Sequence, residues 1–274
     1  MSRLTLFAIP LALFCAGASR AQVPVSYTKP AQASENSSAG PSAMTPRELA
    51  EMQGDILMAR KEYASAIGAY VKVLEADPKS AQVLNKVGVA FQQLGDLNRA
   101  ERFYKKAVHA DKNFASAINN YGTVEYEKKH FGKAITLYKK ALEYHTETAT
   151  LYSNLGYAYF GNKEYPQAMN SFAQALALDP GIFERKGTGG SVIQQRTASD
   201  PGLFYFFVAK TYAQKGDAER AAHYLKMARD DGYNNFLSAQ TDVAFARVIK
   251  DPRVQEVLQT PPSYAAPAKK QDPN

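Results

Sequence analysis

Apolar residues recur at three- and four-residue spacings along most of the chain, and short polar stretches separate these runs. Such spacing places the apolar residues on one face of a helix, so it predicts amphipathic helices of about 12 to 14 residues each. Short polar turns such as Leu94-Gly95-Asp96 divide the helices into pairs. The pattern therefore predicts a succession of helical hairpins.

The hairpins repeat with a constant period of 34 residues. Glycines mark the period, alanines follow them in step, and an aromatic residue comes four positions after each alanine. A residue four positions later lies on the same helical face, so each bulky ring is placed next to a small side chain. We expect the small residues to let two antiparallel helices approach closely while the rings fill the seam. The positions are Gly54, Gly88, Gly122 and Gly156, then Ala66, Ala100, Ala134 and Ala168, then Tyr70, Tyr104, Tyr138 and Phe172.

These units resemble tetratricopeptide repeats, whose pattern combines leucine-glycine, an aromatic three residues later, and an alanine, aromatic, alanine and proline series. The third unit departs from the pattern at Glu125, where an aromatic residue is expected. The resemblance covers about residues 47 to 233 and implies an all-α fold, an α–α superhelix of about five helical hairpins with C-terminal capping helices. The fourth unit matches best, at Tyr152, Leu155, Gly156, Tyr159, Tyr165, Ala168, Phe172, Ala175 and Pro180.

A fifth unit is out of phase with the first four, because a polar stretch is inserted before it. Thr45, followed by Pro46 and then Glu48, signals the start of the folded region. Thr241 and Asp251-Pro252 are candidate starts of short C-terminal capping helices. The expected organisation is a signal peptide (1–21), a disordered linker (22–45), four contiguous units (46–180), an inserted loop (181–200), the fifth unit with the cap (201–258) and a disordered tail (259–274).

The first residues predict export of the chain. Arg3 precedes an uncharged stretch at 4–19, and small residues stand where a cleavage site after Ala21 needs them. We therefore expect a periplasmic or secreted protein. A membrane anchor is one alternative, although the stretch is shorter than the roughly 20 residues that a span needs, and lipidation at Cys15 is another. Cleavage would remove the only cysteine, which excludes disulfides and thiol chemistry from the mature chain.

The charge of the chain is mildly basic, with 33 basic and 26 acidic residues and a formal net charge of +7. Lysines recur at one position of the second helices and beside it, which predicts a basic stripe. This stripe is either a solvated outer face or a surface that contacts anionic lipid or polysaccharide of the cell envelope. No nucleic-acid-binding motif accompanies it, so we expect no nucleic-acid partner. Its members are Lys72, Lys105, Lys106, Lys139 and Lys140.

The sequence contains no arrangement typical of an enzyme. Its four histidines stand at unrelated repeat positions and at no spacing known from metal sites. The glycine-rich segment 187–190 lacks the ending of a phosphate-binding loop, and no predicted strand precedes it. No nucleophile, base and oxyanion donors are grouped together. We therefore expect no catalytic activity, no metal and no cofactor.

The resemblance to tetratricopeptide repeats implies a concave groove lined by the first helix of each hairpin. Asparagine side chains facing this groove offer a donor and an acceptor to a peptide backbone, and aromatic residues offer apolar surface. Alternatively, the asparagines bond between helices and the aromatics pack between them. The leading hypothesis is a noncatalytic adaptor of the cell envelope that binds an extended peptide or a partner protein; the alternative is a structural or surface-associated protein that uses the basic stripe. The candidate groove residues are Asn85, Asn119, Asn120, Asn154, Tyr126, Tyr157 and Phe160.

Overall fold

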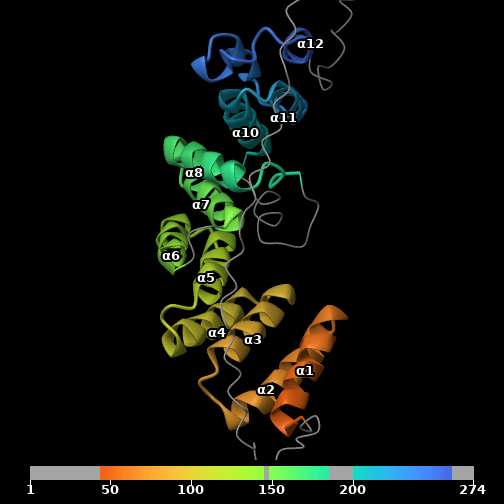
Figure 1. Ribbon diagram of the computed structural model, residues 1–274, viewed down its shortest axis with the longest axis vertical. Coiled ribbons are helices and arrows are strands. Elements are labelled where there is room, and N and C mark those ends of the chain that lie inside the picture. Colours follow the sequence, from red (N-terminus) through yellow and green to blue (C-terminus); the bar gives the residue numbers. More distant parts are fainter. Residues whose placement is uncertain (1–43, 145–147, 185–199, 261–274) are drawn as a thin grey trace, which may run out of the picture. The chain divides into compact units, whose positions relative to one another are not determined.

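The computed structural model describes residues 44–144, 148–184 and 200–260, which form helices and, within these ranges, no strand (Figure 1). The predicted signal peptide, the linker as far as residue 43, most of the inserted loop (185–199) and the tail from residue 261 lie outside the described residues. The helices are α1 (Pro46–Ala59), α2 (Tyr63–Ala76), α3 (Ala81–Gln93), α4 (Leu97–Ala110), α5 (Ala115–Glu127), α6 (Phe131–Tyr144), α7 (Ala149–Gly161), α8 (Tyr165–Leu178), α10 (Pro201–Lys215), α11 (Ala218–Asp230) and α12 (Pro252–Gln259), with short 3-10 helices η1 (Phe236–Gln240) and η2 (Val243–Phe245).

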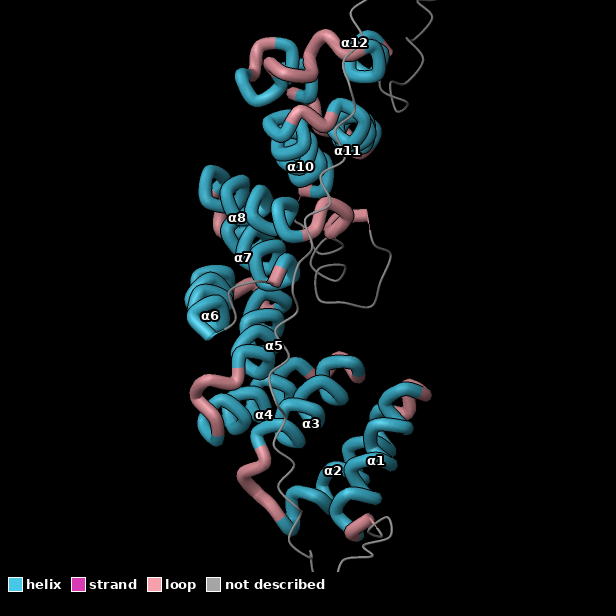
Figure 2. The backbone as a smooth tube through the Cα atoms, in the orientation of Figure 1, coloured by secondary structure: helices cyan, strands magenta, loops and turns pink. Residues whose placement is uncertain are grey.

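Consecutive helices pack as five hairpins, α1 with α2, α3 with α4, α5 with α6, α7 with α8 and α10 with α11 (Figure 2). In the first four hairpins the second helix also packs against the first helix of the next hairpin, and α12, η1 and η2 pack on the fifth. The all-α superhelix of five hairpins with a C-terminal cap is thereby confirmed. The helices of the first four hairpins are 13 or 14 residues long, as the periodicity predicts.

The seam inside each of the first four hairpins is formed by a glycine facing an aromatic ring. A Cβ atom added at Gly156 would lie 2.4 Å from the ring of Phe172 on the paired helix. At Gly54, Gly88 and Gly122 the corresponding distances to the facing tyrosine ring are 2.4, 2.6 and 2.8 Å. Real side chains do not approach so closely, so glycine is required at each position. The 34-residue period of the sequence therefore arises because each of these hairpins contains one such close contact between a glycine and an aromatic ring.

Local signals set the helix ends where the sequence predicts them. Thr45 and Glu48 form a capping box around the start of α1, with Pro46 in the first turn. Asp77 and Asp179 each follow the last residue of a second helix and precede a proline, which cannot continue the helix.

The C-terminal cap differs in part from the expectation. Pro252 begins α12 behind Asp251, as predicted. Thr241, however, starts no helix: it ends η1, and Asp242 caps the short turn η2 through its side chain. The carboxylate of Asp242 reaches the backbone N–H of Ala244 at 2.9 Å, so Asp242 takes the capping role assigned to its neighbour.

The first residues of the predicted inserted loop belong to the folded core. Ile182 and Phe183 are buried, and the ring of Phe183 packs against those of Tyr157 and Phe172. The sequence predicted a loop from residue 181, but Ile182 and Phe183 are apolar and cover the aromatic seam of the fourth hairpin, so they belong to the core. Within the described ranges, no helix combines the length and the apolar character that crossing a bilayer demands.

Candidate functional site

Four asparagines on the first helices of three neighbouring hairpins form one continuous hydrogen-bonded chain, here called the asparagine ladder. Asn120 on α5 donates through Nδ2 to Oδ1 of Asn85 on α3 at 3.0 Å. Asn154 on α7 donates in the same way to Asn119 on α5 at 2.9 Å. Asn119 in turn donates to Asn120 at 3.2 Å, which joins the two pairs. The structure thus shows the interhelical bonds that the sequence left as an alternative.

The ladder leaves its members unequally accessible. Asn154 is fully buried, so its side chain offers no surface to a partner, and the expectation that it faces an open groove is corrected. Asn85, Asn119 and Asn120 are partly exposed. Each primary amide carries two N–H donors, and the ladder uses one donor of Asn119 and one of Asn120. The bonds between these amides fix their orientation before any partner arrives.

Asn119 and Asn120 open onto a pocket of about 500 Å³, here called the amide pocket. Its walls come from the turn before α5, from α5 itself, from the end of α6 and from the start of α7. Thr148, which precedes α7, also lines this pocket, and its hydroxyl oxygen is buried without a hydrogen-bond partner among the described residues. An unpaired buried hydroxyl costs about 1–3 kcal/mol. The lining residues are Asp111, Asn113, Phe114, Ala115, Ser116, Asn119, Asn120, Tyr144, Thr148, Thr150 and Leu151.

The three aromatic residues assigned to the groove lie in the core instead. Tyr126, Tyr157 and Phe160 are only 3%, 1% and 4% exposed. Tyr157 stacks on Phe204 at a centroid distance of 5.1 Å, and Phe160 packs edge-on against the same ring at 5.7 Å. Burial raises the pKa of Tyr157 well above its ordinary value. The fifth hairpin covers two of these rings, so the prediction that they offer apolar surface to a partner is wrong.

Known protein families match segments of the first four hairpins. A family described as TPR repeat matches residues 54–95 and 122–163, and two families described as tetratricopeptide repeat match residues 81–114 and 149–182. The chain is a tetratricopeptide repeat protein. Its family and fold support a protein-interaction module.

Solved structures share the fold of this tetratricopeptide repeat protein. PilF of Pseudomonas aeruginosa is 21% identical with a TM-score of 0.52, over 77% of this chain and 86% of that one. MamA from Desulfovibrio magneticus RS-1 is 19% identical with a TM-score of 0.51, over 68% of this chain and 95% of that one. No curated protein matches the sequence.

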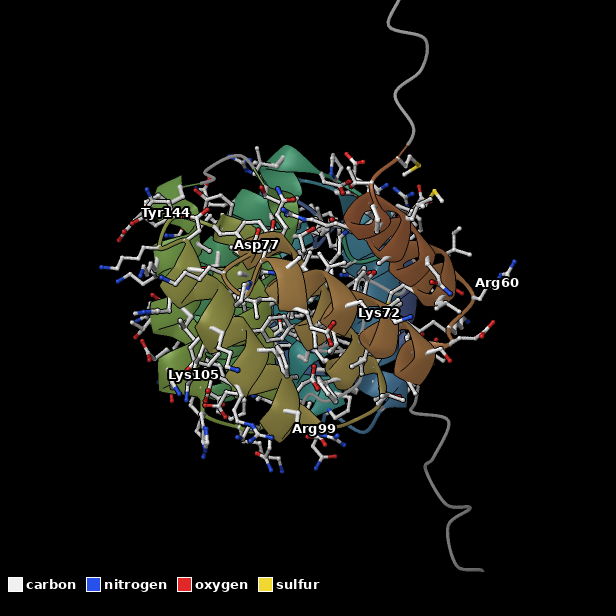
Figure 3. All side chains as sticks on the ribbon, turned by 90° about the horizontal axis from the view of Figure 1, so that it is seen from below. Arg60, Lys72, Asp77, Arg99, Lys105 and Tyr144 are labelled. Atoms are coloured by element: carbon white, nitrogen blue, oxygen red, sulfur yellow. The ribbon has the colours of Figure 1, made fainter. Side chains whose placement is uncertain are left out.

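The predicted basic stripe lies on the second helices of the repeats, and its members differ in their surroundings. Lys72 and Lys105 reach the surface from α2 and α4 (Figure 3). Lys105 forms an ion pair with Glu101 at 2.5 Å and lies over the ring of Tyr121, so its charge is partly neutralised. Lys106 lies over the ring of Phe103. The neighbouring lysines of the stripe are therefore not equivalent as binding groups.

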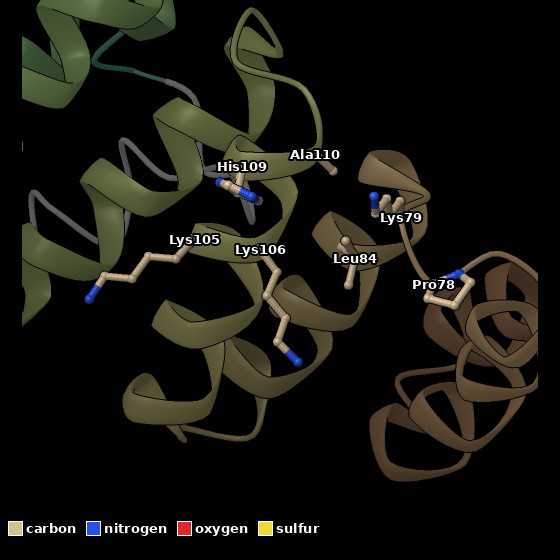
Figure 4. A pocket seen from close by; sticks show the side chains of 7 residues that line it. All are labelled: Pro78, Lys79, Leu84, Lys105, Lys106, His109 and Ala110. Atoms are coloured by element: carbon tan, nitrogen blue, oxygen red, sulfur yellow. The ribbon is translucent and has the colours of Figure 1, made fainter.

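Two of these lysines line a pocket of about 630 Å³ beside α4, here called the basic pocket. Lys79 enters it from the turn before α3, and His109 from the last turn of α4 (Figure 4). Neither residue belongs to the stripe that the sequence predicts. The lining residues are Pro78, Lys79, Leu84, Lys105, Lys106, His109 and Ala110, none of which is acidic.

An ionic cluster around the buried carboxylate of Glu125, at the third repeat, was missed by the sequence reasoning. The side chain of Glu125 is only 1% exposed, and its carboxylate accepts a hydrogen bond from Nζ of Lys133 at 2.7 Å. The second carboxylate oxygen lies 2.8 Å from Nδ1 of His130. Burial alone lowers the pKa of Lys133, but the hydrogen bonds to Glu125 and Tyr121 outweigh it and raise that pKa. The only sequence signal was the missing aromatic residue at this position of the repeat.

The described residues offer no obvious metal chemistry. They contain no group of three or more histidine, cysteine, aspartate or glutamate side chains arranged to hold a metal ion. The candidate sites among the described residues are the amide pocket, with its asparagine amides and the unpaired hydroxyl of Thr148, and the separate basic pocket. Such groups suit the binding of a partner.

Proposed function

We propose that this chain is a noncatalytic adaptor that binds an extended peptide segment of a partner protein at the amide pocket. Membership of the tetratricopeptide repeat family supports a protein-interaction role in general. The observation that carries the finer proposal is the buried hydroxyl of Thr148 without a partner among the described residues, in a pocket that Asn119 and Asn120 also line. When the side chain of Thr148 turns toward the pocket, a polar atom of a ligand would satisfy that hydroxyl.

A peptide backbone fits this pocket chemically. Each of its units presents one N–H donor and one C=O acceptor, and an amide or hydroxyl side chain can meet either. Because Asn119 and Asn120 are held by the ladder, binding orders few side chains, and this lowers its entropic cost. Contacts to the backbone hold an extended chain without a strict demand on its sequence.

The test uses peptides selected from a random displayed library on the immobilised full chain, with affinities then measured in solution. Thr148→Val should weaken binding about threefold to tenfold, because one hydrogen bond to the peptide is lost. The same substitution should raise the free energy of unfolding, because it removes a buried polar group that has no partner among the described residues. A purely structural threonine would not change affinity and stability in opposite directions.

The matched control is Thr136→Val, because Thr136 lies exposed on α6, where its hydroxyl donates to the backbone of Gly132. It should leave peptide affinity unchanged. Replacing Asn119 and Asn120 together by alanine should weaken binding about tenfold or more. If the selected peptides bind the Thr148 and asparagine variants as tightly as the unaltered chain, the amide pocket is not the site.

A second candidate function is contact with an anionic surface of the cell envelope through the basic stripe. It is favoured by the exposed lysines on successive second helices, and it assumes export by the signal peptide to the periplasm or the exterior. Binding to vesicles that contain phosphatidylglycerol should weaken with added salt. The substitutions Lys106→Glu and Lys140→Glu should abolish it, and binding that survives them unaltered counts against the stripe.

A further inference from the structure

The lysine and histidine side chains of the basic pocket surround an apolar floor. Lys79, Lys106 and His109 lie around Leu84, whereas Lys105 extends away from them (Figure 4). Lys105 is also occupied by its ion pair with Glu101. Among the described residues, neither Lys79, nor Lys106, nor His109 forms a salt bridge. Two ammonium groups without a salt bridge, of which that of Lys106 lies over the ring of Phe103, and an imidazole thus line one pocket.

No acidic side chain of the described residues lines this pocket. Two other cations of α4 are paired: Arg99 with Asp96, and Lys105, which also lines the pocket, with Glu101. Cations that line one pocket without a carboxylate leave its positive charge uncompensated, and a bound anion would neutralise it. The pocket is also far larger than a phosphate ion, and Pro78, Leu84 and Ala110 give it apolar surface. Both features together suit an anion that carries an organic group.

We propose that the basic pocket binds the phosphate group of a phosphate ester, through Lys79, Lys106 and His109. Ammonium groups and an imidazole N–H donate charge-assisted hydrogen bonds to phosphate oxygens, and the organic part of the ester lies against Leu84. The phosphate is supplied either by the headgroup of an anionic lipid or by a small soluble ester. This inference rests on the second candidate function above and narrows it from a stripe along α2, α4 and α6 to one pocket.

The experiment compares two double variants of the full chain that remove the same charge. Lys79→Gln with Lys106→Gln removes two cations from the pocket, and Lys72→Gln with Lys140→Gln removes two stripe cations outside it. Each protein is titrated with vesicles of phosphatidylglycerol in phosphatidylcholine and, separately, with glycerol 3-phosphate. The imidazole resonance of His109, assigned with His109→Gln, reports occupancy of the pocket directly.

The pocket variant should lose about tenfold in affinity for either probe. The stripe variant should lose only about twofold for vesicles, because its exposed lysines attract the anionic surface without contacting the phosphate. The His109 resonance should shift on titration of the unaltered chain and of the stripe variant, and stay in place in the pocket variant. Binding of vesicles alone identifies a lipid headgroup as the source of the phosphate, and binding of glycerol 3-phosphate identifies a soluble ester.

Three results would overturn the inference. Equal losses in the two double variants would mean that vesicles are attracted by the stripe as a whole, so the second function would stand without the pocket. Binding unchanged in the pocket variant would place the site elsewhere. Absence of binding to either probe would remove both the pocket and the second function.

Discussion

Alanine at Gly156 is expected to destabilise the fourth hairpin, because the added methyl group enters space that the ring of Phe172 occupies. The new Cβ would lie 2.4 Å from both Cδ1 and Cε1 of that ring, whereas carbon atoms in contact are about 3.5–4.0 Å apart. The ring is fully buried and packs edge-on against Tyr157, Phe183 and Phe204 at centroid distances of 5.4, 5.3 and 5.9 Å. It therefore has little room to move aside.

Two opposing contributions set the size of the effect. Alanine is favoured over glycine in a helix interior by about 1 kcal/mol, and overpacking a core costs about 1–3 kcal/mol. Since the contact is too short by about 1 Å against a surrounded ring, we take the upper end of that cost, and the net loss is about 2 kcal/mol. Gly68 on α2 has no heavy atom within 4 Å of its added Cβ, so Gly68→Ala should stabilise by about 0.5–1 kcal/mol.

Denaturant unfolding of the full chain, followed by the helical circular dichroism signal, measures both variants. The two midpoints should move in opposite directions from that of the unaltered chain. Adding Phe172→Leu to Gly156→Ala should cost less than the sum of the two single changes, because the smaller side chain makes room for the methyl group. If Gly156→Ala proves as stable as Gly68→Ala, close contact at the seam does not limit this position and the reasoning is refuted.

Two further predictions concern the ionic groups. Burial alone raises the pKa of Glu101, but hydrogen bonds from Lys105 and Lys128 outweigh it and hold that pKa below its ordinary value of 4.5. A lowered folded-state pKa stabilises the protein above the unfolded-state value, so the free energy of unfolding should fall as the pH drops below about 4.5, and Glu101→Gln should flatten this part of a measured pH profile. Lys133→Met leaves the buried carboxylate of Glu125 with one partner fewer. It should lower the free energy of unfolding, measured by thermal unfolding, by about 1–2 kcal/mol. The loss is smaller than for a fully buried pair, because Lys133 is half exposed. Adding Glu125→Leu should restore most of the loss, and a double variant less stable than Lys133→Met alone would contradict this.

The fold was predictable because its determinants are local and repeated. Gly88 and Tyr104 stand at the same separation as Gly122 and Tyr138, and each pair makes the same contact. The periodic pattern therefore reports helix pairing directly, without knowledge of distant residues. The fifth hairpin was found despite its shifted register, because its small and large residues keep their internal spacing.

The site was less predictable, because it depends on what neighbouring repeats cover. Tyr157 stands at a position that faces the groove in the family pattern. In the structure, however, Phe204 stacks on it, and this residue lies 47 positions later in the chain. The basic pocket joins Lys79 from a turn to Lys106 and His109 on α4, and no repeat position is common to all three. A helical pattern gives the face of each residue but not the element that packs on that face.

The bonds between first helices explain why a partner would bind at one place rather than along the whole face. Glu51 meets Lys86, Asn85 meets Asn120, and Asn119 meets Asn154, each across a separation of 35 residues. Since the repeat length is 34, every such bond joins one repeat position to the next position of the following repeat.

These bonds occupy polar side chains between successive hairpins and fix the rotation of one hairpin relative to the next. A partner that approaches these helices therefore meets side chains already bonded to one another, and breaking those bonds would offset what it gains. The hydroxyl of Thr148 differs, because no bond to another described residue has to be broken before it can bind a ligand. Affinity should accordingly concentrate at the amide pocket, and variants of the ladder away from it should alter stability more than binding.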